Sequence, residues 1–285
     1  MNKELEIIYQ NIANQSELGQ SSNYDDHYNP KRLYPIPRAP KRQEINLDPN
    51  STTFYGFDCW NHYEVSWLNS KGKPVVAMAV ISYDCHSPCI IESKSLKLYF
   101  NSLNNTTFPD VETVVQTISK DLSHCIGSEV AVNVYPLSEI ASQTIYAAFD
   151  GVCLDKLDIE CSVYHVMPDF LSTSSELVEE VLYSDLLKSN CLVTNQPDWG
   201  SVQIIYKGKK INHEGLLKYL ISFRNHNEFH EQCIERIFAD IMRFCQPESL
   251  TVYGRYTRRG GLDINPIRST EPCAFDGQNI RLIRQ

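Results

Sequence analysis

Residues 110–137, DVETVVQTISKDLSHCIGSEVAVNVYPL, join an amphipathic helix to a strand. Apolar residues recur every three or four positions in the first part and mark one helical face: Val111, Val114, Val115, Ile118, Leu122 and Cys125. Gly127 suits the end of this helix, because glycine adopts the left-handed conformation that is common there. EVAVNVYPL then has the composition of a strand, so the stretch predicts a helix followed directly by a strand.

The segment that precedes this helix predicts a long β-hairpin. TFYGFDCWNHYEVSWL (53–68) and PVVAMAVISY (74–83) are rich in aromatic and β-branched residues. Between them lies NSKGK (69–73), which contains Gly72 and is typical of a turn. A hairpin followed by a helix and a further strand favours an antiparallel sheet.

The second half of the chain repeats this order of elements. We expect strands around VLYSDLL (181–187) and SVQIIYKGKK (201–210), helices at GLLKYLISF (215–223) and HEQCIERIFADIMRFC (230–245), and a strand at SLTVYGRYTRR (249–259). An offset of 121 residues pairs Lys97 with Lys218, Phe108 with Phe229, and Ser128 with Ser249. The chain is therefore predicted to contain a degenerate internal duplication.

Two similar halves predict an α+β protein with antiparallel sheets and helices packed on one face. Residues 1–50 precede the first half as an extension, predicted to be an ordered or semi-ordered arm and not a core strand. It is polar at first and then reads YPIPRAPKR, with three prolines that remove backbone donors. We therefore expect an arm (1–50), a first module (51–145) and a second module (146–285).

Charge and composition limit the classes of function. The 285 residues carry a net charge of −9, with a pI of about 5.4. Such a chain repels a phosphate backbone, so a broad nucleic-acid-binding face is not expected, although a local basic pocket for a small anion remains open. No apolar run approaches the roughly 20 residues of a membrane span, and the N-terminal residues resemble no signal peptide. We expect a cytoplasmic protein with no membrane contact, whose ten cysteines are reduced thiols.

One segment offers a nucleophile. KSNCLVTNQPDWGS (188–201) places Cys191 in a loop rich in Asn, Thr, Pro and Gly. Asp198 follows Pro197 in a predicted turn that could fold back toward the thiol. A thiolate attacks electrophiles, and a nearby acid can protonate the atom that gains negative charge. The alternative is a buried structural cysteine beside a turn aspartate.

Two further segments could bind a ligand at the start of a helix. EFHEQC (228–233) places His230 and Glu231 at a helix start, where Glu231 either reads a nucleobase edge or simply favours helix initiation. ESKSLKLYF (92–100) presents Lys94 and Lys97 on one face, either as a phosphate site or as a solvated lysine face.

A fourth segment combines two arginines with two glycines. YTRRGGLDINPIRS (256–269) contains Arg258 and Arg259 directly before the Gly-Gly pair. Glycine lets a backbone approach a ligand, and arginine binds phosphate through two parallel hydrogen bonds. A surface turn flanked by arginines is the alternative.

Other sites are not indicated. No G-x-G-x-x-G follows a strand, so a Rossmann cofactor site is not expected. CHSPC (85–89) lacks a second ligand pair at zinc spacing, and we expect no metal site.

Taken together, the four segments resemble the 7-cyano-7-deazaguanine reductases of queuosine biosynthesis, the QueF family, in its long two-module form. The resemblance extends from about residue 30 onward, and ESKSLKLY fits the family signature at every position. It implies two tandem tunnelling-fold (T-fold) modules, one with the signature and one with the nucleophile. It also implies reduction of 7-cyano-7-deazaguanine to 7-aminomethyl-7-deazaguanine by two NADPH through a cysteine thioimide.

The resemblance also implies a role for individual residues. Cys191 corresponds to the nucleophile and Asp198 to the proton donor. The implied substrate-binding residues are Ile91, Glu92, Ser93, His230 and Glu231. The implied NADPH-binding residues are Ser93, Lys94, Arg259 and Gly260. The substrate is a free nucleobase, so direct contact with nucleic acid is not implied, and a homodimer is expected.

The sequence departs from the family pattern at three positions. Leu192 and Asn195 replace a common proline and glycine beside the nucleophile, and Leu103 replaces a phenylalanine. Asparagine tolerates the left-handed backbone region, so we expect the loop to keep its shape. Three alternatives remain open at this stage: a zinc-dependent cyclohydrolase or pterin synthase, a binding module without chemistry, and a thiol-based hydrolase.

Overall fold

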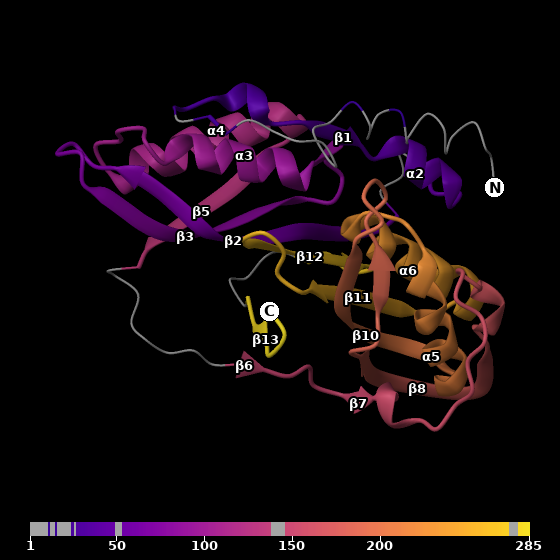
Figure 1. Cartoon of the computed structure of the whole chain (residues 1–285). Helices are drawn as coiled ribbons and strands as arrows, with labels where there is room; N and C mark the ends of the chain where they lie inside the picture. The colour runs from indigo at the N-terminus through magenta and orange to yellow at the C-terminus, as the bar shows by residue number, and fades with distance from the viewer. Residues whose placement is uncertain are drawn as a thin grey trace. The chain divides into compact units, whose positions relative to one another are not determined.

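The computed structural model describes residues 11, 15, 24–25, 27–48, 53–137, 146–273 and 279–285, which form two compact units. Unit 1 comprises the described residues within 1–50, 59–144 and 258–263; unit 2 comprises those within 51–58, 145–257 and 264–285. Both units are mixed α+β with antiparallel strands (Figure 1). These ranges differ from the expected modules at 51–58 and 258–263, because strands β2 (Tyr55–Leu68) and β12 (Leu262–Ser269) each contribute residues to both units.

Unit 1 contains a sheet with two helices on one side of it (Figure 1). The strands follow the order β5 (Val130–Pro136), β3 (Pro74–Asp84) and β2, and β3 is antiparallel to β5. The turn between β2 and β3 is the predicted one: Gly72 has φ +74° and its N–H donates to the Asn69 carbonyl at 2.9 Å. The hairpin prediction is therefore confirmed.

The helices of unit 1 are α3 (Ser93–Leu103) and α4 (Val111–Ile126). The Asp110 carboxylate accepts the Thr113 N–H at 2.7 Å and begins α4, and Gly127 ends it with φ +72°, as predicted. The residues of α4 that face the sheet are fully buried: Val114, Ile118, Leu122 and Ile126. Leu103, which replaces the phenylalanine of the family pattern, is also fully buried.

The arm contributes a short strand that its proline-rich sequence does not predict. Strand β1 (Pro35–Pro37) pairs with β4 (Cys89–Ile91) in a separate two-stranded sheet, and Ile36 is fully buried. Neighbouring ladder bonds run from the Glu92 N–H to the Tyr34 carbonyl and from the Arg38 N–H to the Pro88 carbonyl. Because hydrogen-bonded pairs alternate along an antiparallel ladder, both prolines of β1 fall where no donor is needed. The short helices η1 (Pro30–Arg32) and α2 (Ala39–Glu44) flank this strand.

Unit 2 follows the same plan with longer strands. Its strand order is β12, β11 (Ser249–Tyr256), β10 (Pro197–Ile211), β8 (Thr173–Ser184) and β7 (Val152–Cys153), and β9 (Lys188–Asn190) pairs with β10. Helices α5 (His213–Ser222) and α6 (His230–Cys245) lie on one side of these strands (Figure 1). The remaining elements are η2 (Leu154–Lys156), η3 (Pro168–Phe170), η4 (Phe223–Asn225), β6 (Tyr146–Ala147) and β13 (Arg281–Leu282). No helix in the described part of the chain is long and apolar enough to cross a membrane.

Equivalent elements recur in the two units, but not at one constant offset. Helices α3 and α5 begin 120 residues apart, whereas α4 and α6 begin 119 apart. Tyr99 donates to Asp121 at 2.7 Å in unit 1, and Tyr219 donates to Asp240 at 2.7 Å in unit 2. The constant offset of 121 is therefore wrong, because the two helices begin 18 residues apart in unit 1 and 17 residues apart in unit 2, so Phe108 and Phe229 are not at equivalent positions.

A buried arginine organises the core of unit 2. Arg268 donates to Asp58 at 2.8 Å and to Glu235 at 2.9 Å, and its side chain is 0 % exposed. Phe54, directly before β2, packs on Phe238 of α6, with ring centroids 5.6 Å apart. One guanidinium thus neutralises two buried carboxylates from β2 and α6, which would otherwise be costly to desolvate.

We expect Arg268→Met to lower the free energy of unfolding by about 3–5 kcal/mol, because it leaves two buried carboxylates without their cation. Urea denaturation monitored by circular dichroism measures the change. Lys207→Met is the matched control: Lys207 forms an exposed pair with Glu248 at 3.1 Å and should leave the midpoint unchanged. Equal midpoints for the two variants would contradict this role of Arg268.

Candidate functional site

A short hairpin in unit 2 carries the predicted nucleophile and proton donor. Strand β9 pairs with β10 so that Asn190 lies opposite Pro197 and Ser189 opposite Asp198, and the Cys191 N–H donates to the Gln196 carbonyl at 2.8 Å. Side chains alternate along a strand, so Cys191 and Asp198 emerge on the same face of this hairpin. Both are buried, at 7 % and 2 % exposure. The predicted turn at Asp198 is wrong, since Asp198 lies within β10, but its proximity to Cys191 is retained through strand pairing.

The loop that follows the nucleophile keeps the shape expected for it. Asn195 has φ +55°, the left-handed region where asparagine is tolerated, and its N–H donates to the Cys191 carbonyl at 3.1 Å. The Asn195 side chain also accepts a hydrogen bond from Asn227. The substitution of asparagine for the usual glycine therefore preserves a tight turn immediately after Cys191.

The start of helix α6 carries two further predicted site residues of unit 2, His230 and Glu231. His230 is its first residue, and His230 Nε2 lies 3.6 Å from Asp198 Oδ1. Glu231 is 1 % exposed. An acid that merely began a surface helix would lie in solvent, so its burial favours the ligand-binding interpretation over simple helix initiation.

A buried carboxylate ties this helix start to the nucleophile loop. Glu228 accepts two hydrogen bonds from Arg236, at 3.0 and 2.8 Å, and lies 2.9 Å from His226 Nε2. Burial raises the pKa of Glu228, but Arg236 and His226 outweigh it and hold the pKa well below the ordinary glutamate value. The backbone of residues 226–228 is also bonded to the backbone of Asn190. The Asn190 N–H donates to the His226 carbonyl at 2.8 Å, and the Asn190 carbonyl accepts from the Glu228 N–H at 3.0 Å.

The ring of Tyr256, at the end of β11, packs against the ring of His230. The two rings are T-shaped, with centroids 4.1 Å apart. Burial, with Cys233 and Asp198 nearby, raises the pKa of Tyr256 well above its usual value, so the hydroxyl stays protonated. Gly200 makes room for this ring, because a Cβ there would lie 3.1 Å from it. Sequence reasoning missed both Tyr256 and Glu228, since nothing in their local pattern distinguishes them from core residues.

Unit 1 holds the remaining predicted residues. Glu92 caps α3 through hydrogen bonds from the Lys94 and Ser95 N–H groups, at 2.8 and 2.7 Å, and is 1 % exposed. Burial raises the pKa of Glu92, although the hydrogen bonds from Lys94 and Ser95 act in the opposite direction. Ile91 is buried at the end of β4, and Ser93 is half-buried at the first position of α3.

Cationic side chains from distant parts of the sequence meet beside α3. Gly260 has φ +53°, and a Cβ at this position would lie 2.0 Å from Lys97 Nζ, so any other residue would require the lysine side chain to move. Burial and then the charge of Arg259 lower the pKa of Lys97, while Glu92 and Glu64 oppose this shift. The structure therefore brings Lys94, Lys97, Arg259 and Gly260 to one end of α3, where an anion would relieve the repulsion.

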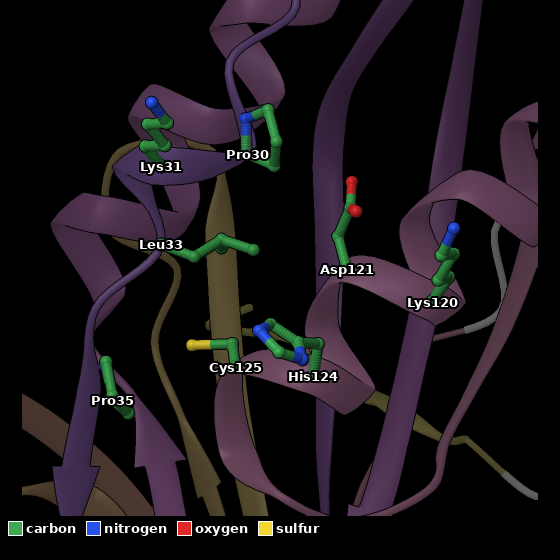
Figure 2. A pocket seen from close by; sticks show the side chains of 8 residues that line it. All are labelled: Pro30, Lys31, Leu33, Pro35, Lys120, Asp121, His124 and Cys125. Carbon is green, nitrogen blue, oxygen red and sulfur yellow. The ribbon is translucent and has the colours of Figure 1, made fainter.

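Other candidate sites involve different residues. Figure 2 shows a cavity of about 760 Å³ between the arm and α4, lined by Pro30, Lys31, Leu33, Pro35, Lys120, Asp121, His124 and Cys125. The ammonium groups of Lys31 and Lys120 point away from Leu33 and Cys125 (Figure 2), so no set of charges converges on it. Ligand atoms of Asp84, Cys85 and His86 lie within 4.8 Å of one another because the three are consecutive in a turn. The ten cysteines all lie in the described part of the chain, and each is a free thiol.

We expect Glu228→Gln to lower the free energy of unfolding at pH 7 by about 3 kcal/mol, because it removes the buried charge that pairs with Arg236. The pKa of Glu228 is lower in the folded protein than in the unfolded chain, where it is about 4.3, so its charge stabilises the fold above that pH. This contribution is lost as the pH falls through the pKa of the folded protein. The difference from the unsubstituted protein should therefore shrink below about pH 4. Urea unfolding across pH 3–8 tests this, with exposed Glu160→Gln as control; a constant difference would contradict it.

Comparisons with known proteins identify the family of this chain. A family described as nitrile reductase, 7-cyano-7-deazaguanine-reductase N-term, matches residues 24–134, and a family described as QueF-like protein matches residues 197–273. A relative from Legionella pneumophila (strain Lens) is 99 % identical over 285 residues, which is 100 % of both chains. Relatives from Hydrogenovibrio crunogenus (strain DSM 25203 / XCL-2) and Dechloromonas aromatica (strain RCB) are 54 % and 55 % identical, over 96 % and 95 % of this chain and 98 % and 95 % of theirs. All three are named NADPH-dependent 7-cyano-7-deazaguanine reductase. The chain therefore belongs to the 7-cyano-7-deazaguanine reductase family, also called the QueF family.

Proposed function

We propose that this protein reduces 7-cyano-7-deazaguanine to 7-aminomethyl-7-deazaguanine with two NADPH, through a thioimide on Cys191, in queuosine biosynthesis. The observation that carries the proposal is the hairpin that presents Cys191 and Asp198 on one face, with His230 3.6 Å from Asp198. We assign the two units to tandem tunnelling-fold modules, with the signature in the first module (51–145) and the nucleophile in the second (146–285), preceded by the arm (1–50). The repeated order of elements supports this assignment.

Cys191 and Asp198 divide the activation of the nitrile between them. The Cys191 sulfur forms a bond to the nitrile carbon, and Asp198 transfers a proton to the nitrile nitrogen, which gives a thioimide. After the first reduction, the carbon–sulfur bond breaks, the thiolate of Cys191 is released and an imine remains. His230, within reach of Asp198, relays protons in the second reduction.

The cations beside α3 suit a phosphate-bearing cofactor. When bound, NADPH supplies the hydride for each of the two reductions. Lys94 and Arg259 would hold its phosphates, Ser93 would donate a hydrogen bond, and Gly260 would let the backbone approach. The contact between Gly260 and the end of the Lys97 side chain supports this fit, because it brings two cationic segments of the chain together at the start of α3.

The buried carboxylates would select the base. Glu92 and Glu231, each 1 % exposed, are acceptors that match the ring and amino N–H groups of a guanine-like edge. A base without those donors could not form these hydrogen bonds in the desolvated site, which gives selectivity against it. Ile91 and Ser93 would complete this substrate-binding segment.

The same proposal covers partners and location. The partner is a small nucleobase, with no direct contact with nucleic acid, because the net charge is −9. We further propose a homodimer in the cytoplasm. Sedimentation of the purified protein measures its oligomeric state.

We expect Cys191→Ala to abolish NADPH oxidation in the presence of 7-cyano-7-deazaguanine, because the nitrile carbon is not activated without the thiol. NADPH absorbance and the amount of amine formed are measured together, with a ratio of two expected for the unsubstituted protein. Cys161→Ala, a partly buried thiol outside the hairpin, is the control and should retain full activity. A near-normal rate in Cys191→Ala would refute covalent catalysis.

We expect Asp198→Asn to lower the rate of adduct formation by about 10²–10⁴, because the nitrile nitrogen loses its proton donor. Mass spectrometry of protein mixed with the nitrile alone, without NADPH, records the adduct on Cys191. Exposed Asp169→Asn is the control. Normal adduct formation in Asp198→Asn would exclude Asp198 as the donor.

Two other measurements separate the alternative functions. Stoichiometric zinc in purified protein would favour a cyclohydrolase or pterin synthase. Release of ammonia without NADPH oxidation would favour a thiol-based hydrolase. A covalent adduct between Cys191 and the nitrile would rule out a binding module without chemistry.

A further inference from the structure

The side chain of Gln285 is inserted into unit 2 beside the end of strand β11. Its Nε2 donates to the Tyr256 carbonyl at 3.0 Å and to Asn265 Oδ1 at 2.8 Å. Its Oε1 accepts from Arg255 Nε at 2.8 Å and from the Leu282 N–H at 3.1 Å. Gln285 is only 7 % exposed, so all four bonds lie in a desolvated environment where losing one is costly.

The neighbouring residue holds the adjacent strand. Arg284 Nη2 donates to the Gly200 carbonyl at 3.0 Å and to Ser201 Oγ at 3.1 Å in β10. Gly200 and Tyr256 are directly opposite each other in the β10–β11 ladder. The segment 281–285 therefore forms hydrogen bonds with both members of this pair: Gln285 with the Tyr256 carbonyl and Arg284 with the Gly200 carbonyl.

That pair lies next to the reacting groups. Gly200 follows Asp198 by two residues on β10, and the ring of Tyr256 contacts the ring of His230 at 4.1 Å. A shift at the end of β11 would move the Tyr256 ring, and His230 with it, relative to Asp198. Displacements of about 1 Å can cost two orders of magnitude in rate, so a hydrogen bond at this point can influence catalysis.

We propose that Gln285 is a positioning residue, which acts through Tyr256 to hold His230 against Asp198. Its effect on turnover rests on the proposed function, whereas its effect on the geometry of His230 does not. The hydrogen bond to the Tyr256 carbonyl is the decisive contact, because a carbonyl can only accept and requires the amide N–H of Gln285.

Gln285→Glu is the sharpest variant, because it keeps the acceptor for Arg255 but cannot donate to the Tyr256 carbonyl. We expect kcat to fall roughly tenfold in Gln285→Glu and in Gln285→Met, with KM for the nitrile changed less than about twofold. We also expect the pH profile of kcat to change, since the group that exchanges protons with Asp198 is displaced. Ile283→Ala, in the same segment but 78 % exposed, should match the unsubstituted protein in every respect.

A measurement that needs no turnover separates this proposal from the proposed function. In protein labelled with ¹³C at histidine Cε1, the His230 resonance, assigned through His230→Gln, should move in both Gln285 variants and stay fixed in Ile283→Ala. Loss of thermal stability with an unchanged His230 resonance, kcat and pH profile would mean that Gln285 only anchors the chain, and would overturn the proposal. Absence of activity in the unsubstituted protein would refute the proposed function alone.

Discussion

The backbone hydrogen bonds on either side of Asn190 set the geometry on which the catalytic unit depends. They join the residue before Cys191 to residues 226 and 228, and so fix the nucleophile relative to the start of α6. The buried Glu228 carboxylate stabilises this connection, because its bidentate pair with Arg236 and its contact with His226 satisfy a charge that would otherwise be expensive to bury. Cys191 thus belongs to a hydrogen-bonded hairpin, although the sequence around it is typical of a loop.

The two units use one plan for different chemistry. Each pairs a tyrosine with an aspartate across its two helices, Tyr99 with Asp121 and Tyr219 with Asp240. The residue that begins the first of these helices differs, however. Glu92 begins α3 as a buried carboxylate, while Asn212 begins α5 as an exposed neutral amide. A repeated framework can therefore place a charged group in one unit and leave its counterpart a simple cap.

Much of the framework was predictable from the sequence because it depends on local patterns. The 3.6-residue periodicity of α4 and α6, the turn at Gly72 and the stop at Gly127 all follow from preferences within a few residues. The short strand at Pro35–Pro37 was missed because two prolines argue against a strand. Only the register with β4, which places them at positions without ladder bonds, makes that strand possible. The position of Asp198 was predicted for the wrong reason, since it approaches Cys191 through strand pairing and not through a turn.

By itself, the sequence determined the order of helices and strands, the α+β class, the internal repeat and the segments that carry reactive residues. These properties are encoded in periodicity, turn residues and short motifs, which act over a few positions. The tertiary structure alone decided which residues meet: Gly260 beside Lys97, 163 positions apart in sequence, and Gln285 on the carbonyl of Tyr256. Such contacts depend on the register of strand pairing and on close packing, and neither leaves a trace in the local pattern of residues.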